Sequence, residues 1–588
     1  MATPTSSVME RIVALCKRRG FIFQSSEIYG GINGFWDYGP LGTELKRNLK
    51  EAWWNDIVRC PPIGPNGHPI DVVGVDCTII MNPKVWEASG HATGFADPMI
   101  DCRECRSRFR ADTLYSVTWV NSEHLHDACF SEKPADFSPE EMNALSAMIK
   151  GWANASPEEQ RKHRETLDLR RLKHLGIVIP PTLQKTAEAS NGVEAARLAV
   201  LSAREAKQLG SPVVLETWPV VNSPNPLSAI ECPKCHARGT LTEPRQFNLM
   251  FKTHVGALED ASALAYLRPE TAQGIFANFK NVLDTSRVKV PFGIGQVGKS
   301  FRNEINPRNY TFRSREFEQM EIEFFCHPDG SMQWYEFWRN VRFNWYVNLG
   351  LKSEKLRLRD QGPEELAHYS KACADIEYLF PFSDEHQELE GVAHRGNFDL
   401  TQHAKFSGKD LTYFDDEAWE RDRPNFGGDK EKEKTAKNAE PYRFLPTVIE
   451  PSAGADRATL AFLCEAYCED QAPDEKGVMQ TRVVMKFHPK LAPIKVAVFP
   501  LVKKEGMPDI ADAIYKAAKK HVTAYYDDKG AVGRRYRRQD EAGTPFCVTV
   551  DGQTLQDGTV TIRDRDTLQQ VRVHKDGVVA WLQERLAR

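Results

Sequence analysis

The sequence predicts an α+β protein of several domains. Two strand-like segments flank a polar centre at residues 306–309 and predict an antiparallel hairpin over residues 292–325. Strands and helices alternate after Pro489, which is typical of a small α/β domain. Two Cys-x-x-Cys pairs enclose 126 residues that carry helix-start signals, so we expect a mostly helical insertion there. With 588 residues, each of these domains can bury its own core.

The composition is that of an ordinary globular protein, with 41% apolar and 27% charged residues. The net charge of −4 gives no general attraction to nucleic acid, so any RNA binding must use local basic patches. No run of 18 apolar residues exists, and residues 1–20 lack the apolar centre of a signal peptide, so we expect no membrane span. Thirteen cysteines without a secretion signal indicate a reducing compartment, and we expect a cytoplasmic protein.

The first segment is expected to form a helix over residues 8–19. Ser7 and Glu10 fit a capping box, and Gly20 fits the position just after the last turn. A glycine-rich loop, residues 28–42, follows it.

A second helix and a strand are expected next. Apolar side chains recur with helical spacing in residues 43–59, and a strand over residues 71–81 is ended by Pro83. The helix places four apolar side chains on one face, namely Leu45, Leu49, Trp53 and Ile57. By themselves these two elements are those of any protein core.

The two cysteine pairs, Cys102 with Cys105 and Cys232 with Cys235, predict a structural zinc site. Each pair places two thiolates on one tight turn, and two such turns complete a tetrahedron. The long separation weakens this pattern, because the spacing no longer fixes the pairing. Redox-active dithiols and unrelated thiols remain as alternatives.

The segment between the cysteine pairs, residues 106–231, is expected to be mostly helical. Ser138 and Ser156 are each followed by Pro-Glu-Glu, which places a cap, proline at the first helical position and an acidic residue after it. Residues 161–175 are rich in arginine and lysine, and a solvated helix face is the default interpretation.

The hairpin separates its side chains onto two faces, because successive residues of a strand point in opposite directions. Met320, Ile322 and Phe324 offer one face to a core. We expect Arg302 and Glu304 to share a face of the first strand, and Phe317, Gln319 and Glu321 to share a face of the second. Side chains on the polar face suit a flat, polyanionic ligand, since arginine binds phosphate and an aromatic ring stacks on a base. A salt-bridged surface hairpin is the alternative.

Three further segments follow the hairpin. Residues 334–349 are expected to be helical, and residues 416–440 have hardly an apolar residue, which predicts a mobile surface loop. Residues 448–468 predict a strand, a turn of small residues and a helix. Arg457 at the start of that helix is suited to bind a phosphate.

The C-terminal segment, residues 489–588, alternates strands and helices. Residues 494–501, 546–550 and 559–563 are expected strands, and residues 508–521 and 577–587 are expected helices. A basic turn with one aromatic ring provides charge for phosphates, namely Arg534, Arg535, Arg537 and Arg538 with Tyr536. A solvated basic turn is the alternative.

Three motifs resemble those of the class II aminoacyl-tRNA synthetases. Residues 301–304 and 315–321 (FRNE and REFEQME) resemble motif 2, and residues 448–457 (VIEPSAGADR) resemble motif 3. The expected helix and strand in residues 43–81 resemble motif 1. These motifs are most similar to those of the single-chain, homodimeric glycyl-tRNA synthetases. The resemblance covers most of the chain except two insertions.

The resemblance implies a fold and a set of partners. The fold is an antiparallel-sheet catalytic domain flanked by helices, followed by an anticodon-binding domain. Residues 1–101 and 236–488 then form the catalytic domain, residues 102–235 the insertion with its structural Zn²⁺, and residues 489–588 the anticodon-binding domain. The implied partners are tRNA, glycine, ATP with Mg²⁺, and a second copy of the chain. Insertions at this place in the family approach tRNA, which gives residues 161–175 a second interpretation.

The resemblance also implies roles for single residues. Arg302 and Arg457 are the catalytic arginines, which hold the α- and γ-phosphates, and Phe317 stacks on adenine. The ATP site comprises Arg302, Asn303, Glu304, Phe312, Arg313, Phe317, Glu388, Leu389, Gly454, Asp456 and Arg457. The glycine site comprises Arg110, Glu270, Phe317, Gln319, Glu321, Glu450 and Ser452. Glu388 and Glu450 hold Mg²⁺, and the four arginines between residues 534 and 538 contact tRNA.

The expected activity is the ATP-dependent attachment of glycine to tRNA(Gly) through a glycyl-adenylate. A class II synthetase for another small amino acid is the alternative enzyme. A zinc-containing RNA-binding paralogue that lacks amino-acid activation is the non-enzymatic alternative, although intact Arg302, Glu304 and Arg457 argue against it.

Overall fold

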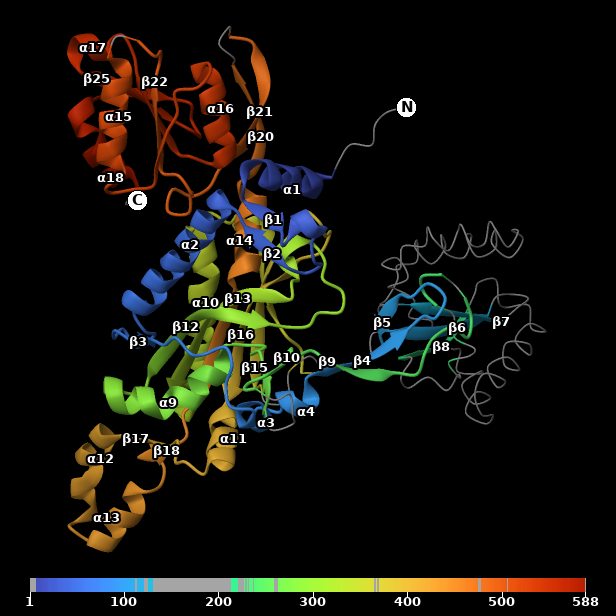
Figure 1. The fold of residues 1–588 in the computed structure, drawn as a ribbon. Helices are drawn as coiled ribbons and strands as arrows, with labels where there is room; N and C mark the ends of the chain where they lie inside the picture. The colour runs from blue at the N-terminus through green and yellow to red at the C-terminus, as the bar shows by residue number, and fades with distance from the viewer. Residues whose placement is uncertain are drawn as a thin grey trace. The chain divides into compact units, whose positions relative to one another are not determined.

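A computed structural model describes most of the chain, and Figure 1 shows its fold. The description covers residues 7–586 except 112–113, 121–124, 131–212, 220–226, 228–229, 231, 236, 258–262, 364–365, 367–369, 474–476 and 505. The chain divides into two compact units, residues 93–249 and the remainder, and each is described by itself. No helix within the described ranges is both long and apolar enough to cross a membrane.

A seven-stranded sheet forms the centre of the larger unit (Figure 1). Its strand order is β14-β15-β16-β19-β13-β12-β3, and every pair is antiparallel except β12 with β3. The strands are β3 (Asp71–Gly74), β12 (Phe292–Phe301), β13 (Glu316–Cys326), β14 (Leu356–Asp360), β15 (Ala372–Tyr378), β16 (Gln387–Gly396) and β19 (Thr447–Gly454). The expected antiparallel sheet is therefore present.

The predicted hairpin is β12 with β13, but its loop is longer than expected. Pairing begins at Phe301 with Glu316, so Arg302 and Glu304 lie in the loop rather than on a strand face. That earlier assignment to the first strand is wrong. Asn309 and Tyr310 both have positive φ angles, of 59° and 62°, which turns the chain tightly within this loop. The loop thus carries the polar residues past the end of the sheet.

Helices cover the two faces of this sheet differently. On one face, α2 (Pro40–Trp54), α10 (Ser331–Asn348) and α14 (Ala455–Ala466) bury the core that contains Met320, Ile322 and Phe324. On the other face, α9 (Ala272–Ser286) and α11 (Phe398–Ser407) form a smaller core with Phe292 and Phe325. Helices α9 and α11 cover only part of that second face, and the polar residues of the candidate site lie beside them.

The N-terminal elements largely follow the sequence prediction. Helix α1 (Val8–Arg19) has the expected capping box between Ser7 and Glu10, and Gly20 ends it with a φ of 78°. Leu45, Leu49, Trp53 and Ile57 are all about 1% exposed, as the helical spacing predicts. The following strand is shorter than expected and ends at Gly74. Short elements in this region are β1 (Ile22–Gln24), β2 (Trp36–Tyr38), α3 (Lys84–Ala88) and α4 (His91–Gly94).

The segment predicted as a mobile loop instead contains two helices. These are α12 (Asp416–Asp422) and α13 (Lys430–Lys437), and the side chains of Asp415 and Asp429 accept hydrogen bonds at their N-termini. Trp419 is buried against Tyr442, which anchors an otherwise polar segment. The nearby short strands are β10 (Lys252–His254), β11 (Leu264–Tyr266), β17 (Tyr413–Phe414) and β18 (Arg443–Phe444).

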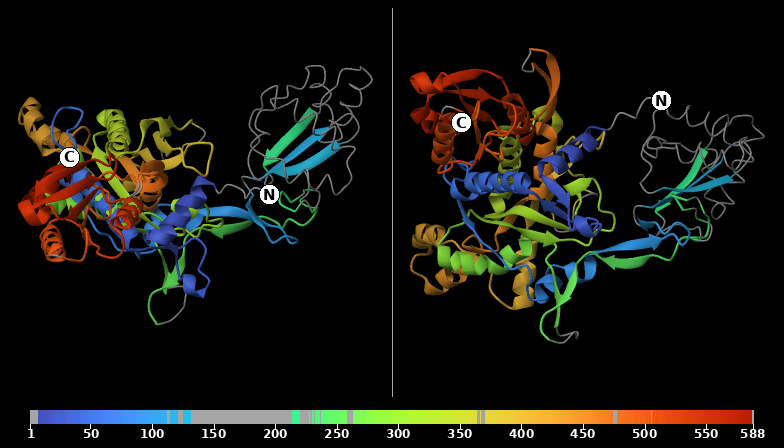
Figure 2. Two further views of the ribbon diagram at one scale, coloured as in Figure 1. Left: turned by 90° about the horizontal axis from the view of Figure 1, so that it is seen from above. Right: turned by 45° about the horizontal axis from the view of Figure 1, so that its top comes forward.

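The C-terminal part begins with a hairpin of β20 (Tyr467–Pro473) and β21 (Met479–Met485). A five-stranded sheet of order β23-β22-β24-β25-β26 follows, in which β23, β22 and β24 are parallel. Helices cover both of its faces (Figure 2). Its elements are β22 (Val496–Pro500), α15 (Met507–Ala518), β23 (Ala524–Tyr526), α16 (Val532–Ala542), β24 (Phe546–Val550), α17 (Thr554–Asp557), β25 (Thr559–Asp564), β26 (Gln570–His574) and α18 (Val578–Leu586). The five expected elements are all present.

The smaller unit contains two three-stranded sheets, β5-β4-β9 and β7-β6-β8. The strands are β4 (Ala96–Asp101), β5 (Arg108–Arg110), β6 (Tyr115–Val120), β7 (Leu125–Phe130), β8 (Val213–Pro219) and β9 (Arg245–Asn248). The predicted helix starts at Ser138 and Ser156 and the basic residues 161–175 lie outside the described residues. Where it is described, the segment between the cysteine pairs is therefore a sheet.

Candidate functional site

The amino-acid end of the candidate site is a hydrogen-bonded group around Glu321. This carboxylate is 1% exposed and accepts hydrogen bonds from Ser452 Oγ at 2.7 Å, from Gln319 Nε2 at 3.2 Å and from Thr271 Oγ1. Gln319 also donates to Ser452 Oγ at 3.2 Å. Gln319, Glu321 and Ser452 lie on the neighbouring strands β13 and β19, so the sheet itself fixes their positions.

Glu270 lies next to this group, at the turn that precedes α9. It accepts a hydrogen bond from Gln273 Nε2 at 2.9 Å, and its other oxygen is 3.4 Å from His91 Nε2. Burial disfavours its charge, but His91, Arg395 and the Gln273 bond outweigh that effect and hold the pKa of Glu270 below its usual range. Glu270 is therefore a charged carboxylate in a nearly enclosed place.

Glu450 and Arg395 form a buried ion pair beside Glu321. Arg395 donates to Glu450 Oε2 at 2.6 Å and makes two further bonds to Asp399, at 2.8 and 3.0 Å. Burial, together with Glu321, Glu270 and Asp399, outweighs Arg395 and raises the pKa of Glu450 to about 8. Arg395 and Asp399 were not among the predicted site residues. Arg395 lies near the end of β16 and Asp399 in the first turn of α11, so this ion pair joins a strand to the helix that follows it.

Glu323 is a third carboxyl group in this cluster, and it too was not predicted. Its side chain is 0% exposed, and neither carboxyl oxygen has a hydrogen-bond partner. Carboxylate oxygens of Glu321, Glu323 and Glu450 lie within 4.8 Å of one another. Burial and the charges of Glu450 and Glu321 raise the pKa of Glu323 well above its ordinary value, which favours its protonated form.

The nucleotide end of the site contains two arginine–aromatic pairs. The guanidinium of Arg302 lies 5.6 Å from the ring centre of Phe317, and that of Arg457 lies 4.5 Å from Phe312. Gln319, two residues after Phe317, pairs with Gly454, three residues before Arg457. The two arginines therefore lie at the same end of the sheet, as the sequence predicts.

Around the two arginine–aromatic pairs, charged side chains of opposite sign contact one another. Arg457 donates to the carbonyl of Glu388 at 2.9 Å and lies 3.3 Å from its carboxylate. Arg313 lies 3.9 Å from Glu304. Burial lowers the pKa of Arg313, and the charges of Arg308 and Arg457 lower it further. This end of the site is thus a positive cluster suited to phosphate.

A β-bulge places Glu388 on the site face of the sheet. Across β15 and β16, Ile376 pairs with Glu390 but Glu377 pairs with Glu388, so Leu389 is an extra residue. Leu389 is 1% exposed and packs in the core, whereas Glu388 is exposed. The two predicted Mg²⁺ ligands each contact an arginine, because Glu388 meets Arg457 and Glu450 meets Arg395.

The side chain of Asp456, a predicted ATP-binding residue, forms hydrogen bonds with other residues of the chain. Its carboxylate accepts hydrogen bonds from Tyr38, from Lys46 and from the backbone N–H of Glu318, at 2.7, 2.6 and 2.7 Å. The side chain therefore helps to hold β2, α2, β13 and α14 together, and its predicted contact with ATP stays a prediction. Asn303 lies in the hairpin loop, and Gly454 ends β19 at the start of α14.

Arg110 lies in the smaller unit, on β5. Its guanidinium forms an ion pair with Asp97 at 3.2 Å, and both side chains belong to the sheet β5-β4-β9. Its predicted contact with the amino-acid substrate stays a prediction.

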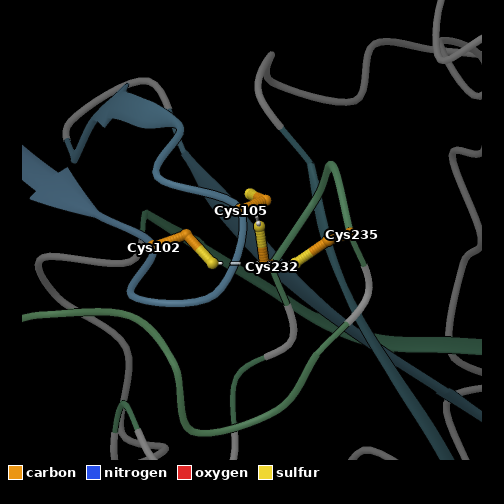
Figure 3. A group of neighbouring side chains, drawn as sticks. All are labelled: Cys102, Cys105, Cys232 and Cys235. Atoms are coloured by element: carbon orange, nitrogen blue, oxygen red, sulfur yellow. Dashed lines mark hydrogen bonds between the residues drawn. The ribbon is translucent and has the colours of Figure 1, made fainter.

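The four predicted zinc ligands lie together in the smaller unit (Figure 3). The Sγ atoms of Cys102 and Cys235 are 3.6 Å apart, and those of Cys105 and Cys232 are 3.8 Å apart. Four thiolates bound at ~2.3 Å from one tetrahedral Zn²⁺ lie ~3.8 Å from each other, so the residues fit this metal. The turns are closed by hydrogen bonds from the N–H of Cys102 to Ser107 and from that of Cys232 to Ala237.

The four arginines predicted to contact tRNA lie on helix α16, not on a turn. Arg534 is exposed, whereas Arg535 is 3% exposed and donates to the carbonyls of Pro500, Asp527 and Leu501. Arg537 and Arg538 are half-buried, and Arg538 pairs with Asp527 at 2.5 Å. Arg535 is therefore a structural residue, because its guanidinium is taken up by three carbonyl groups.

Comparisons with known proteins are consistent with this arrangement. Residues 230–423 match the family described as "tRNA synthetase class II core domain (G, H, P, S and T)", and residues 495–585 match "Anticodon binding domain". A glycine–tRNA ligase of Rhodopirellula baltica is 52% identical over 98% of this chain and 99% of its own length. Glycine–tRNA ligases of Acetivibrio thermocellus and Caldanaerobacter subterraneus are each 44% identical, over 98% and 99% of both chains.

Proposed function

Because this chain belongs to the glycine–tRNA ligase family of class II aminoacyl-tRNA synthetases, we propose that it joins glycine to tRNA(Gly) on the open face of its seven-stranded sheet. It is a ligase that uses ATP and Mg²⁺. The observation that supports the site assignment best is that Arg302 and Arg457 lie at one end of the sheet, next to the carboxylates around Glu321.

Glycine is held by its charged ends. Glu270 attracts the ammonium group by its charge, Glu321 and Glu450 accept hydrogen bonds from it, and Gln319 and Ser452 orient Glu321 toward it. Every other amino acid contains glycine as a part, so selection must exclude side chains rather than recognise one. Ser452 stands at the α-carbon as the wall, because its Oγ is fixed by its hydrogen bond to Glu321.

ATP is held by arginines and aromatic rings. Phe317 stacks on adenine, Arg302 binds the α-phosphate and the glycine carboxylate, and Arg457 binds the γ-phosphate. Asn303, Glu304, Phe312 and Arg313 line the nucleotide from the hairpin loop. The carboxylates of Glu388 and Glu450 are the groups that would hold Mg²⁺, which neutralises phosphate charge when bound. Glu388 fits this role better, because its carboxylate is 56% exposed.

The first step is an in-line displacement at the α-phosphorus. A carboxylate oxygen of glycine attacks, the bond to the β-phosphate breaks, and pyrophosphate leaves with its electron pair. Arg302 neutralises charge that builds on the α-phosphate oxygens, so no general base is needed. In the second step a terminal ribose hydroxyl of the tRNA attacks the glycyl carbonyl, and AMP leaves.

The C-terminal domain is proposed to bind the anticodon end of tRNA. In a parallel sheet, ligands bind beyond the carboxyl ends of the strands, where the strand order reverses. Here the order reverses between β22 and β24, and Leu501 and Val502 are exposed just after β22. Arg534 at the start of α16 adds charge near this edge, and Arg537 and Arg538 follow it.

Three further assignments complete the proposal. Zn²⁺ bound by Cys102, Cys105, Cys232 and Cys235 stabilises the smaller unit, and it leaves no open position for chemistry. The chain forms a homodimer through α2 and β3, the elements that resemble motif 1. The free thiols of the described residues support a cytoplasmic location.

The test is ATP–pyrophosphate exchange with each of the amino acids. Exchange should depend on glycine, and serine, proline or threonine should not replace it. Exchange with one of those amino acids instead would indicate a synthetase of different specificity. Binding of RNA without any exchange would indicate a paralogue that has lost activation.

A further inference from the structure

Gln273, in the first turn of α9, connects two parts of the carboxylate cluster. Its side chain is 0% exposed and donates through Nε2 to Glu270 at 2.9 Å and to Asp399 at 3.1 Å. Asp399 in turn accepts two bonds from Arg395, which also binds Glu450. One buried amide therefore supports Glu270 directly and Glu450 indirectly, and both are proposed to hold the glycine ammonium.

The orientation of this amide is determined by its surroundings. A side-chain amide has a donor on one side and an acceptor on the other, whereas a carboxylate only accepts. The Nε2 of Gln273 must therefore face Glu270 and Asp399, and its Oε1 must face away from them. A rotated amide would place its oxygen against two carboxylates and would leave both without this donor.

His403 lies where the oxygen of this amide points. Its Nε2 is 2.9 Å from Gln273 Oε1, and its ring packs beside Phe276, with the ring centres 6.4 Å apart. His403 is 7% exposed on α11, and burial lowers its pKa, which favours the neutral ring. A neutral imidazole has one donor nitrogen. Because the amide oxygen is an acceptor, that donor must be Nε2.

We propose that His403 is a positioning residue for the amino-acid substrate and that it acts through Gln273. Its Nε2–H holds the amide in the one orientation that donates to Glu270, and so fixes the carboxylate that receives the glycine ammonium. This inference rests on the proposed function and adds to it a residue outside the three motifs. The alternative is that His403 only ties α11 to α9, in which case its loss would lower stability without a selective effect on glycine.

The test is the variant His403→Phe, measured by ATP–pyrophosphate exchange. Phenylalanine keeps a flat ring but has no donor for Gln273, so the KM for glycine should rise about tenfold, as loss of one hydrogen bond that positions a charged group does. The KM for ATP should change less than about twofold, because the bonds of Gln273 do not reach the arginine–aromatic pairs. His403→Gln should restore most of the affinity for glycine, since its amide can place an N–H near the position of Nε2.

The variant Gln273→Met tests the route of the effect. It keeps the length of the side chain but removes the amide, so it should raise the KM for glycine at least as much as His403→Phe does. Because His403 acts through Gln273, adding His403→Phe to Gln273→Met should raise the KM no further. The proposal fails if Gln273→Met leaves this KM unchanged, or if the effects of the two changes multiply.

His394→Phe is the matched control. His394 is also buried, at 0% exposed, but it lies on β16 with its ring 6.5 Å from that of Tyr335 of α10, on the opposite face of the sheet. Like His403→Phe, this change should lower the melting temperature, but it should leave the KM for glycine unchanged. An equal rise in the KM for glycine in both variants would indicate a loosened fold and would contradict a specific role of His403.

Crystal structures of the wild-type chain and of His403→Phe, both without substrates, provide a second comparison. The carboxylate of Glu270 should lie within hydrogen-bond distance of Gln273 in the wild-type chain and should be displaced in the variant. An unmoved Glu270, or an unchanged KM for glycine in His403→Phe, would overturn the proposal. The crystallographic comparison does not depend on which amino acid is activated, so failure of this inference and failure of the proposed function are distinguishable.

Discussion

Ser452 shows how a single hydroxyl residue serves both binding and exclusion. Its Oγ donates to Glu321 at 2.7 Å, and in the proposed site its Cβ faces the α-carbon of glycine, where a larger amino acid would place its first side-chain carbon. Replacing Ser452 by glycine should lower the preference for glycine over alanine by about tenfold, the usual value for one methyl group in a pocket. The measurement is ATP–pyrophosphate exchange with each amino acid.

Ser452→Ala separates the two roles of this residue. It loses the hydrogen bond but keeps the Cβ, so it should retain the discrimination and lose glycine affinity. If Ser452→Gly still rejects alanine as strongly as the wild-type chain, Ser452 is not the wall.

Glu323 should tolerate replacement by its neutral isostere. Burial beside Glu450 and Glu321 raises its pKa well above the ordinary value, so the protonated form is favoured and an amide is a close substitute for it. Glu323→Gln should therefore leave both the unfolding free energy and the exchange rate close to the wild type. Glu321→Gln is the comparison, because it removes a carboxylate that holds the substrate ammonium and should raise the KM for glycine. Equal damage from both changes would mean that Glu323 acts as an anion.

At the residue scale the sequence predicts the side chains on the open face of the sheet better than those that support them. Phe317, Gln319 and Glu321 follow from strand parity and from the motif resemblance. Arg395 and Asp399 are missed because their bonds join β16 to α11 and β19, and one strand pattern does not reveal a partner on another strand. The structural contacts of Asp456 are missed because its three partners come from β2, α2 and β13, distant in sequence.

At the scale of elements, a charged contact joins α2 to β13. Glu318 is 16% exposed in its side chain and binds Lys50 at 2.9 Å and Lys46 at 2.7 Å. Burial disfavours its charge, but the two ammonium groups outweigh burial and lower the pKa of Glu318 to about 2. Because this value is below the ordinary 4.5, the contribution to stability is complete above pH 4.5 and is lost as the pH falls toward 2.

The expected size of this contribution is at most about 3 kcal/mol. Glu318→Gln should lower the unfolding free energy at pH 7 and flatten its fall between pH 4.5 and 2, measured by urea denaturation. Glu316→Gln, on the same strand, removes a more exposed pair with Lys299 and should change stability by less than about 1 kcal/mol. The assignment would be contradicted if the unfolding free energy of the wild-type chain fell no more steeply between pH 4.5 and 2 than that of Glu318→Gln.

The elements that the sequence misjudges are those that depend on one distant contact. Residues 416–440 are almost wholly polar, and periodicity alone gives no apolar face for a helix. Trp419 is the residue that stabilises helical structure in this segment, since its ring packs on Tyr442 and Phe426 and holds α12 in place. Arg302 and Glu304 come directly after β12. Nothing in the sequence around them marks the residue at which the pairing of β12 with β13 ends.

At the scale of the molecule, the four cysteines should make the smaller unit depend on metal. A tetrahedral thiolate site contributes its binding free energy to folding. The purified chain should contain about one zinc per molecule, and a chelator should lower the melting temperature of residues 93–249. Cys105→Ser should also lower this melting temperature. Cys60→Ser changes an exposed cysteine outside the cluster and should leave it unchanged. A metal-free chain with the wild-type melting temperature would exclude a structural metal.

The first helix is bound to the last domain, and this has a consequence for how the chain is made. Arg18 and Arg19 of α1 both contact Glu541 of α16, and the second of these bonds spans 522 positions of sequence. A ribosome that adds about 5–20 residues per second needs roughly 25 to 100 s to make the intervening chain. During that time the arginine side of α1 has no partner to meet. The contact between α1 and α16 therefore forms only after α16 has been made, and a nascent chain stalled before α16 exposes Arg18 and Arg19 without their partner Glu541.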